Sequence, residues 1–207
     1  MDNLQPIKKS QSGTSMIEVL VTLVILLVGL LGIMGLQVRA HQAELESYQR
    51  VQALVLLQDM VDRLNSNRVV ATCYAFTSDP ANGKPFLGTP IPDADYENAP
   101  TCTAGTPDQQ TMALADLDAW DQALQGASES GNAGGIIGAR GCIVQEDPIN
   151  RVYRISISWQ GRVTTIDPAL NDPVLGANSV LTCGSGNYGD ERMRRIVSTT
   201  VRIGNLS

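Results

Sequence analysis

One acidic residue at the entrance of a long apolar segment constrains this chain more than any other feature. Glu18 directly precedes a run from Val19 to Leu36 in which every residue except Thr22 is apolar or glycine. A carboxylate at such a depth in lipid costs about 2.5–3.5 kcal/mol on insertion scales unless it finds a partner. About 20 apolar residues in a helix span about 30 Å, the thickness of a hydrocarbon core. The sequence therefore predicts a membrane-spanning helix whose acidic residue serves a specific contact.

The residues before the apolar run are polar and include two lysines and a short glycine-to-glutamate motif. Lys8 and Lys9 are followed by Gly13-Thr14-Ser15-Met16-Ile17-Glu18, which together with the apolar run resembles the class III signal of type IV prepilins and type II secretion pseudopilins. In that family a prepilin peptidase cuts after the glycine and methylates the new N-terminal residue. The resemblance implies a cut after Gly13, methylation of Thr14, and for Glu18 the assembly role of the family's glutamate. Thr14 departs from the apolar or aromatic residue usual at its position, which varies in the family.

The resemblance and the charge pattern together predict three segments. Residues 1–13 are the cleaved leader, residues 14–37 the transmembrane and assembly half of a long helix, and residues 38–207 a periplasmic pilin domain that includes the amphipathic half of that helix. Because lysines favour the cytoplasmic side, the leader is expected in the cytoplasm and the domain outside the inner membrane. In an assembled extracellular pilus, Glu18 would pair with the N-terminal amine of its own or a neighbouring subunit.

Two plainer interpretations of the apolar segment stay open. A secretory signal peptide could be cut after Val38-Arg39-Ala40, leaving a soluble protein that begins at His41. Against it, the apolar run exceeds the about 7–15 residues of such signals and has an acid at its entrance. A simple membrane anchor would give Glu18 no purpose. Gly29, Gly32 and Gly35 fit either close packing against a neighbouring helix or, by the resemblance, a region that loses helical structure during assembly.

Apolar periodicity predicts two helices. The first should run from Ser15 to Asn67, and its second half should bury residues at helical spacing, namely Leu45, Val51, Leu54, Leu57, Met60, Val61 and Leu64. The second is expected at about 107–125, with a capping box at Thr106–Gln109, a proline at its first position, and Gly126 at its end. Its core-facing residues should be Leu114, Leu117, Trp120 and Leu124, with Trp120 as a core anchor.

Alternation predicts a small antiparallel sheet. In the segment Tyr153–Trp159, apolar residues alternate with Arg154, Ser156 and Ser158, the pattern of a half-buried strand. Neighbouring strands are expected at Cys142–Gln145 and at Ile196–Ile203, the latter entered through Arg192, Arg194 and Arg195, with Val197, Val201 and Ile203 on one face. Residues 127–138 should form a loop. The predicted architecture is α+β and pilin-like, a long N-terminal helix packed on a small antiparallel β-sheet.

Four cysteines, Cys73, Cys102, Cys142 and Cys183, all follow the apolar segment. In an oxidising compartment an even number of cysteines favours two disulfides. Three pairings are open. Cys73–Cys102 and Cys142–Cys183 are preferred because each closes a stretch rich in glycine and proline, and loops of this length imply about 3–4 kcal/mol each in the chain-entropy model. No metal site is expected, because no C-x-x-C pair occurs and the one histidine, His41, is on the predicted helix.

Composition argues against nucleic-acid binding and catalysis. The net charge is −6, and Lys84 would be the one lysine left after the predicted cut, a poor basis for gripping phosphates. A membrane-anchored periplasmic enzyme is the alternative class, but the chain offers no nucleophile paired with a base and no phosphate-cradling glycine loop. Asp93, Asp95 and Glu97 lie in a proline-rich stretch and are better explained as solvated charge. No enzymatic activity, cofactor or small-molecule substrate is expected.

The resemblance narrows to the PilV type of minor pilin. It rests on Glu18–Val21, the helix with Trp120, the strand Tyr153–Trp159 and the arginine-rich last strand. It implies a minor pilin that helps prime or cap type IV pilus assembly at the inner membrane. The implied partners are other minor and major pilins, the inner-membrane assembly platform, prepilin peptidase and a tip adhesin. A minor pseudopilin of a type II secretion system, with the same leader and helix, is the alternative.

Overall fold

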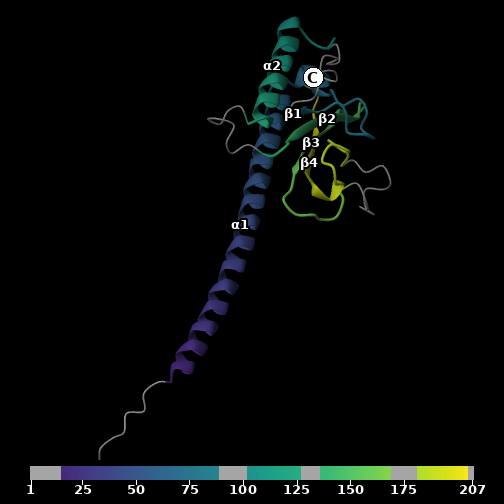
Figure 1. The fold of residues 1–207 in the computed structure, drawn as a ribbon. Coiled ribbons are helices and arrows are strands. Elements are labelled where there is room, and N and C mark those ends of the chain that lie inside the picture. Colours follow the sequence, from purple (N-terminus) through teal and green to yellow (C-terminus); the bar gives the residue numbers. More distant parts are fainter. Residues whose placement is uncertain (1–14, 89–101, 127–135, 169–180, 205–207) are drawn as a thin grey trace, which may run out of the picture. The chain divides into compact units, whose positions relative to one another are not determined.

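The computed structural model describes residues 15–88, 102–126, 136–168 and 181–204. The chain divides into two compact units, Met1–Glu44 and Leu45–Ser207, and the boundary falls within helix α1 (Met16–Ser66) (Figure 1). The described residues of the first unit form the N-terminal part of α1. The second unit contains the rest of α1 and all the other elements.

The second unit combines helices with one antiparallel sheet. After α1 follow η1 (Arg68–Tyr74), β1 (Leu87–Gly88), α2 (Pro107–Leu124), β2 (Arg140–Asp147), β3 (Val152–Gln160), η3 (Glu191–Met193) and β4 (Arg194–Arg202). The strands lie in the order β1-β2-β3-β4, each antiparallel to its neighbour. The α+β prediction, a long N-terminal helix with a small antiparallel sheet, is confirmed.

α1 agrees with the predicted helix, but part of its predicted buried face is wrong. The buried side chains are Gln49, Ala53, Leu57, Met60 and Leu64. Leu45, Val51 and Leu54, which were predicted to join them, are about half exposed. The difference arises because α1 is apolar on two sides, and the domain packs on the side marked by the small, fully buried Ala53.

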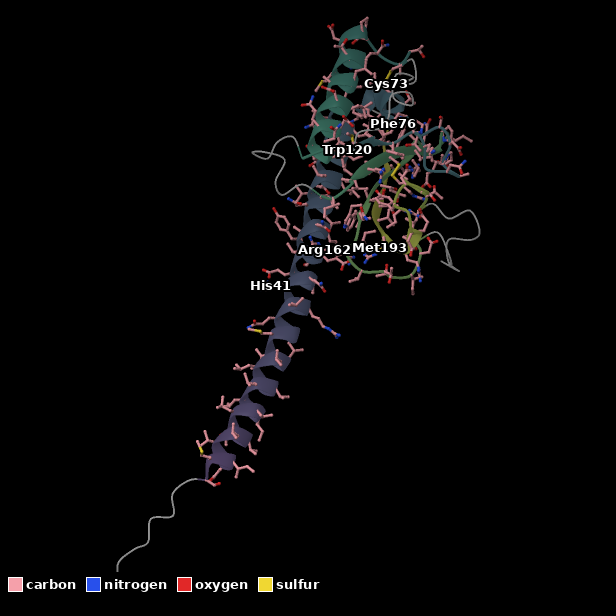
Figure 2. All side chains as sticks on the ribbon, viewed as in Figure 1. His41, Cys73, Phe76, Trp120, Arg162 and Met193 are labelled. Atoms are coloured by element: carbon pink, nitrogen blue, oxygen red, sulfur yellow. A yellow bond between two sulfur atoms is a disulfide. The ribbon has the colours of Figure 1, made fainter. Side chains whose placement is uncertain are left out.

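α2 begins as the sequence predicts. The Thr106 hydroxyl accepts a hydrogen bond from Gln109 N, and Thr106 N donates to the Gln109 side chain, which confirms the capping box. Trp120 is fully buried, confirming it as a core anchor, and its Nε1–H donates to a backbone carbonyl of α1 at 2.9 Å (Figure 2). Ala113 is buried in place of the predicted Leu114, which is half exposed because it lies off the face centred on Leu117.

Gly141 on β2 makes room for Trp120. A Cβ built at Gly141 would lie 2.4 Å from the Trp120 ring and 2.7 Å from the Leu124 side chain. The close approach of α2 to β2 therefore depends on the missing side chain.

β3 is buried on both faces, so the prediction of a half-buried strand is wrong. Tyr153, Ile155 and Ile157 face the hydrophobic core. Ser156 and Ser158, on the other face, are also buried. The segment around Cys183 and Tyr188 covers them: Ser158 Oγ lies 2.9 Å from the Tyr188 hydroxyl, and the disulfide-bonded Sγ of Cys183 lies 3.7 Å from Ser156 O. The alternation of apolar and polar residues in the sequence gives the two faces of the strand, but it does not show that a later segment covers the polar face.

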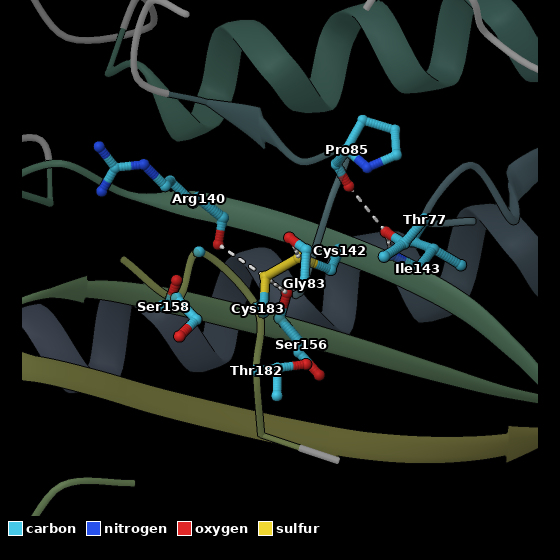
Figure 3. Close-up of a disulfide and its surroundings, with 12 residues drawn as sticks. Thr77, Gly83, Pro85, Arg140, Cys142, Ile143, Ser156, Ser158, Thr182 and Cys183 are labelled. Atoms are coloured by element: carbon cyan, nitrogen blue, oxygen red, sulfur yellow. Dashed lines mark hydrogen bonds between the residues drawn. A yellow bond between two sulfur atoms is a disulfide. The ribbon is translucent and has the colours of Figure 1, made fainter. Parts of the chain in front are cut away.

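The covering segment is attached to the sheet by a disulfide and by a buried arginine. Cys142 on β2 is bonded to Cys183, with the two Cα atoms 5.8 Å apart (Figure 3). Arg194, fully buried at the start of β4, donates to Leu181 O at 2.6 Å and to the Glu191 carboxylate at 2.5 Å. The outer layer over the sheet is therefore held by one covalent and several polar contacts.

β4 follows the predicted arginine cluster and begins two residues earlier than expected, at Arg194. Val197 and Val201 pack against the core, and Ile203 is buried, which confirms the predicted face. Of the predicted loop at 127–138, residues 127–135 lie outside the described residues.

Candidate functional site

Glu18 lies in the first turn of α1. Its backbone N–H donates to Ser15 O at 2.9 Å. A carboxylate in this position interacts favourably with the positive end of the helix dipole. Among the residues that the structure describes, none forms a hydrogen bond or ion pair with the Glu18 carboxylate. The carboxylate is thus available for a partner outside the described chain.

The part of α1 that follows Glu18 is apolar all around. From Val19 to Val38, the large apolar side chains are 50–69% exposed. The polar Thr22 is satisfied locally, because its hydroxyl donates to Val19 O at 2.9 Å. By length and composition, α1 is able to cross a membrane. A helix that is apolar on every side needs an apolar environment, either lipid or other helices.

Within the second unit, α1 keeps an apolar side that the domain leaves uncovered. Tyr48, Val51 and Val55 are 52%, 55% and 63% exposed. Their spacing of three and four residues places them on one side of the helix, roughly opposite Ala53 and Met60, which are buried in the domain. Within the described residues, one side of α1 therefore packs on its own domain and another side is left exposed.

Charged and polar contacts fix this part of α1 to the domain. Arg195 of β4 donates to the Glu46 carboxylate at 2.6 Å. Near the other end, Arg63 lies 2.8 Å from Asp116 of α2. Tyr74 donates to the same carboxylate at 2.5 Å, and burial, together with the hydrogen bond to Asp116, raises the pKa of Tyr74, which stays protonated. The uncovered side of α1 is therefore presented by a helix fixed along its length in this unit.

The predicted site residues fall into separate parts of the chain. Gly13 and Thr14, the predicted processing residues, lie outside the described residues, as do Asp93, Asp95 and Glu97. Glu18 belongs to the first unit, and the four cysteines belong to the second. Cys73 of η1 is bonded to Cys102, with Cα atoms 5.0 Å apart, in addition to the Cys142–Cys183 bond.

Sequence reasoning missed the uncovered side of α1 because Val51 was assigned to the core. The signal that could have found it is the number of apolar residues in this stretch, too many for one face of a helix.

Most acidic side chains in the described residues form ion pairs or hydrogen bonds within the domain. Glu146, beside a small hollow next to Cys142, is paired with Arg154. No cluster of three or more histidine, cysteine, aspartate or glutamate side chains that could hold a metal ion occurs in the described part of the chain.

Comparison with known proteins adds one finding. Residues 35–120 match the model of the Tt1218-like family, described as Type IV pilin Tt1218. The match supports a type IV pilin. It covers much of α1, all of η1 and β1, and α2 as far as Trp120. The architecture of a long apolar N-terminal helix with a four-stranded antiparallel sheet is consistent with a pilin fold. No curated protein and no solved structure matches the chain. The pilin match and the apolar helix fit a membrane-anchored, pilus-associated protein.

The pairing of the cysteines can be tested directly. Peptide mapping of the full chain without reduction should link the peptide that contains Cys73 to the one that contains Cys102, and Cys142 to Cys183, because these pairs are bonded in the structure. Mass spectrometry before and after reduction identifies the linked peptides. Finding Cys73 linked to Cys183 would contradict this arrangement of the domain.

Proposed function

We propose that this chain is a minor pilin that helps prime or cap type IV pilus assembly at the inner membrane. Prepilin peptidase cuts after Gly13 and methylates Thr14. Residues 14–37 hold the subunit in the membrane, with the leader in the cytoplasm, and residues 38–207 form the periplasmic domain. The subunit then moves into the pilus.

The observation that carries this proposal is the apolar surface that α1 leaves exposed in both of its parts. Its first part exposes apolar side chains all around, and its second part has an apolar side, at Tyr48, Val51 and Val55, that its own domain leaves free. In lipid, the first part is solvated by hydrocarbon. In a bundle of such helices, the same surface packs against neighbouring helices without loss of apolar contact. The helix therefore suits a subunit that passes between membrane and filament.

Glu18 sets how neighbouring helices are aligned along their axes in that packing. A carboxylate in an apolar bundle is stabilised when a cation lies beside it, and it is penalised when it is left unpaired. The cation we propose is the methylated N-terminal amine of an adjacent subunit. Support comes from the resemblance around Gly13–Glu18 and from the lack of a Glu18 partner within the described chain.

The proposed partners are those expected of a pilin subunit. They are other minor and major pilins, the inner-membrane assembly platform, prepilin peptidase and a tip adhesin. The PilV type of minor pilin is supported by Trp120 on the second helix, by the strand pattern at Tyr153–Trp159 and by the arginines that lead into β4. We propose no catalytic activity, because a pilin is a structural subunit.

Processing at Gly13 tests the first step. Replacing Gly13 by isoleucine should leave the leader attached, because the peptidase would have to accept a branched side chain at the cut. The wild-type protein should start at methylated Thr14, and the variant should keep residues 1–13, as intact-mass spectrometry of the purified full chain would measure. A wild-type protein that begins at His41 would instead identify a secretory signal peptide, and an identical mass for variant and wild type would contradict the cut after Gly13.

A further inference from the structure

β4 forms one edge of the sheet, and its register shows which backbone groups face outward. Gly161 N donates to Met193 O, and Ile203 N donates to Arg151 O, just beyond the two ends of the β3–β4 pair. In an antiparallel pair, hydrogen-bonded and non-hydrogen-bonded positions alternate. Residues 195, 197, 199 and 201 therefore direct their N–H and C=O groups to β3, and residues 196, 198, 200 and 202 direct theirs away from the sheet.

These outward groups form an open edge, which we define as the outer side of Ile196–Arg202. Among the described residues, none bonds to the outward backbone groups of Ile196, Ser198, Thr200 or Arg202. Within the described residues, cover is found just before β4, where Thr165 N donates to Arg192 O of η3 at 2.9 Å. The edge of β2 that faces away from β3 is different, because it has hydrogen-bond partners: β1 pairs with β2, and Thr77 N donates to Ile143 O.

The side chains along the open edge differ on its two faces. On the core side, Val197 and Val201 are only partly buried and would gain cover from a further strand. On the outer side, Ser198 and Thr200 are exposed. Arg202 is exposed at the end, and no ion pair to it occurs within the described residues. A complementary strand would therefore place apolar residues beside the valines, small polar residues beside Ser198 and Thr200, and a carboxylate beside Arg202.

We propose that the open edge of β4 receives an extended segment of a different protein of the pilus assembly, with this alternation and with an acidic residue opposite Arg202. Backbone hydrogen bonds from the four outward residues would supply affinity, and the alternating side chains and the charge would supply selectivity. The inference rests on the proposed function, since it gives the partner as a component of the pilus or its assembly complex.

A second copy of this chain fits the edge less well. An antiparallel β4–β4 pair has a two-fold axis perpendicular to the sheet, and this rotation reverses α1, which packs on the face of the sheet. Chains anchored in one membrane through the same helix run in the same direction. A pair of β4 strands would therefore make the α1 segments of the two domains, residues 45–66, antiparallel, which does not fit this shared direction.

Proline at position 198 tests the edge. Ser198→Pro removes an outward N–H, and proline is tolerated on edge strands when its nitrogen faces away from the sheet. Incorporation is measured as the fraction of the chain in sheared pili relative to membranes. It should fall by at least about tenfold, whereas the matched Ser198→Ala, which keeps the N–H, should stay within about twofold of wild type. Thr199→Pro, which removes an inward N–H, should instead unfold the domain.

Folding of the Ser198→Pro variant is checked by circular dichroism of the full chain in detergent, and wild-type hydrogen exchange provides a second measurement. The amides of residues 196, 198, 200 and 202 should exchange fast in detergent and become protected in sheared pili. Residues 197, 199 and 201 should be protected in both. Fast exchange of the outward amides in pili, or normal incorporation of folded Ser198→Pro, would overturn the inference and leave the proposed function intact.

Two further outcomes separate the alternatives. A disulfide-linked homodimer of Ser198→Cys in native membranes would identify a second copy as the occupant and overturn the proposal of a different protein. Absence of the wild-type chain from sheared pili would contradict the proposed function, and the inference would fall with it.

Discussion

Alanine in place of Glu18 should leave the chain in the membrane but keep it out of pili. Removing the carboxylate takes away a group that costs about 2.5–3.5 kcal/mol in lipid, so insertion should be as good as wild type or better. In the pilus, the neighbour's N-terminal amine would be left unpaired in an apolar bundle, a loss of about 3–5 kcal/mol for a buried pair, enough to reduce incorporation at least about tenfold. Quantitative immunoblots of membranes and of sheared pili measure both effects.

The control for this experiment is Glu44→Ala on the same helix. Glu44 is also acidic, but it is highly exposed, and the described contact of its carboxylate is with His41 on the preceding turn. Incorporation of Glu44→Ala should stay within about twofold of wild type. The intact mass of Glu18→Ala separates assembly from processing, since the leader should still be removed. Pili that contain a normal amount of Glu18→Ala would contradict the proposed role of the carboxylate.

The second large effect is expected in the core. Trp120→Ala should lower the free energy of unfolding by about 3–5 kcal/mol, because it leaves a cavity between α2 and the sheet and removes the hydrogen bond to Leu56 O. Domains are commonly stable by about 5–15 kcal/mol, so the variant should lose a large part of its stability. Urea unfolding of the full chain in detergent, followed by circular dichroism, measures the change. Leu114→Ala on the same helix, which is half exposed, should have an effect of about 0.5 kcal/mol.

Gly141 provides a matched check on the same contact. Gly141→Ala should destabilise the domain by about 1–3 kcal/mol, because the added Cβ meets the Trp120 ring. Gly204→Ala is the control, since a Cβ there has no heavy atom within 4 Å. In the Trp120→Ala background, the cost of Gly141→Ala should fall, as expected for residues in contact. Equal costs in both backgrounds would contradict the packing of Trp120 on β2.

Sequence reasoning was most successful where local chemistry decides the structure. The capping box at Thr106, the proline after it and Gly126 mark α2 closely, because each satisfies a local requirement of a helix end. The alternation around Ile155 likewise located β3. Among the candidate site residues, Glu18 was chosen because a charge beside an apolar run needs an explanation, and its assembly role stays a prediction.

The features that the sequence did not predict depend on contacts between residues that lie far apart in the chain. Ser156 and Ser158 are buried because a segment more than twenty residues later folds over them, and their polarity is identical in an exposed strand. The free side of α1 at Val51 was missed because apolar spacing gives the faces of a helix but not which face the domain will cover. β1, two residues long, exists through its pairing with β2, and a segment that short has no period to detect.

With the export proposed above, the Cys142–Cys183 bond would link the completion of this domain to its location. The bond spans 41 residues and encloses all of β3, so it fastens the layer over Ser156 and Ser158 to the central strands. Thiols stay reduced in the cytosol and are oxidised beyond the inner membrane. In a subunit retained on the cytoplasmic side, this layer would cover the sheet without the disulfide. Export would be the step at which the disulfide forms and attaches the layer covalently.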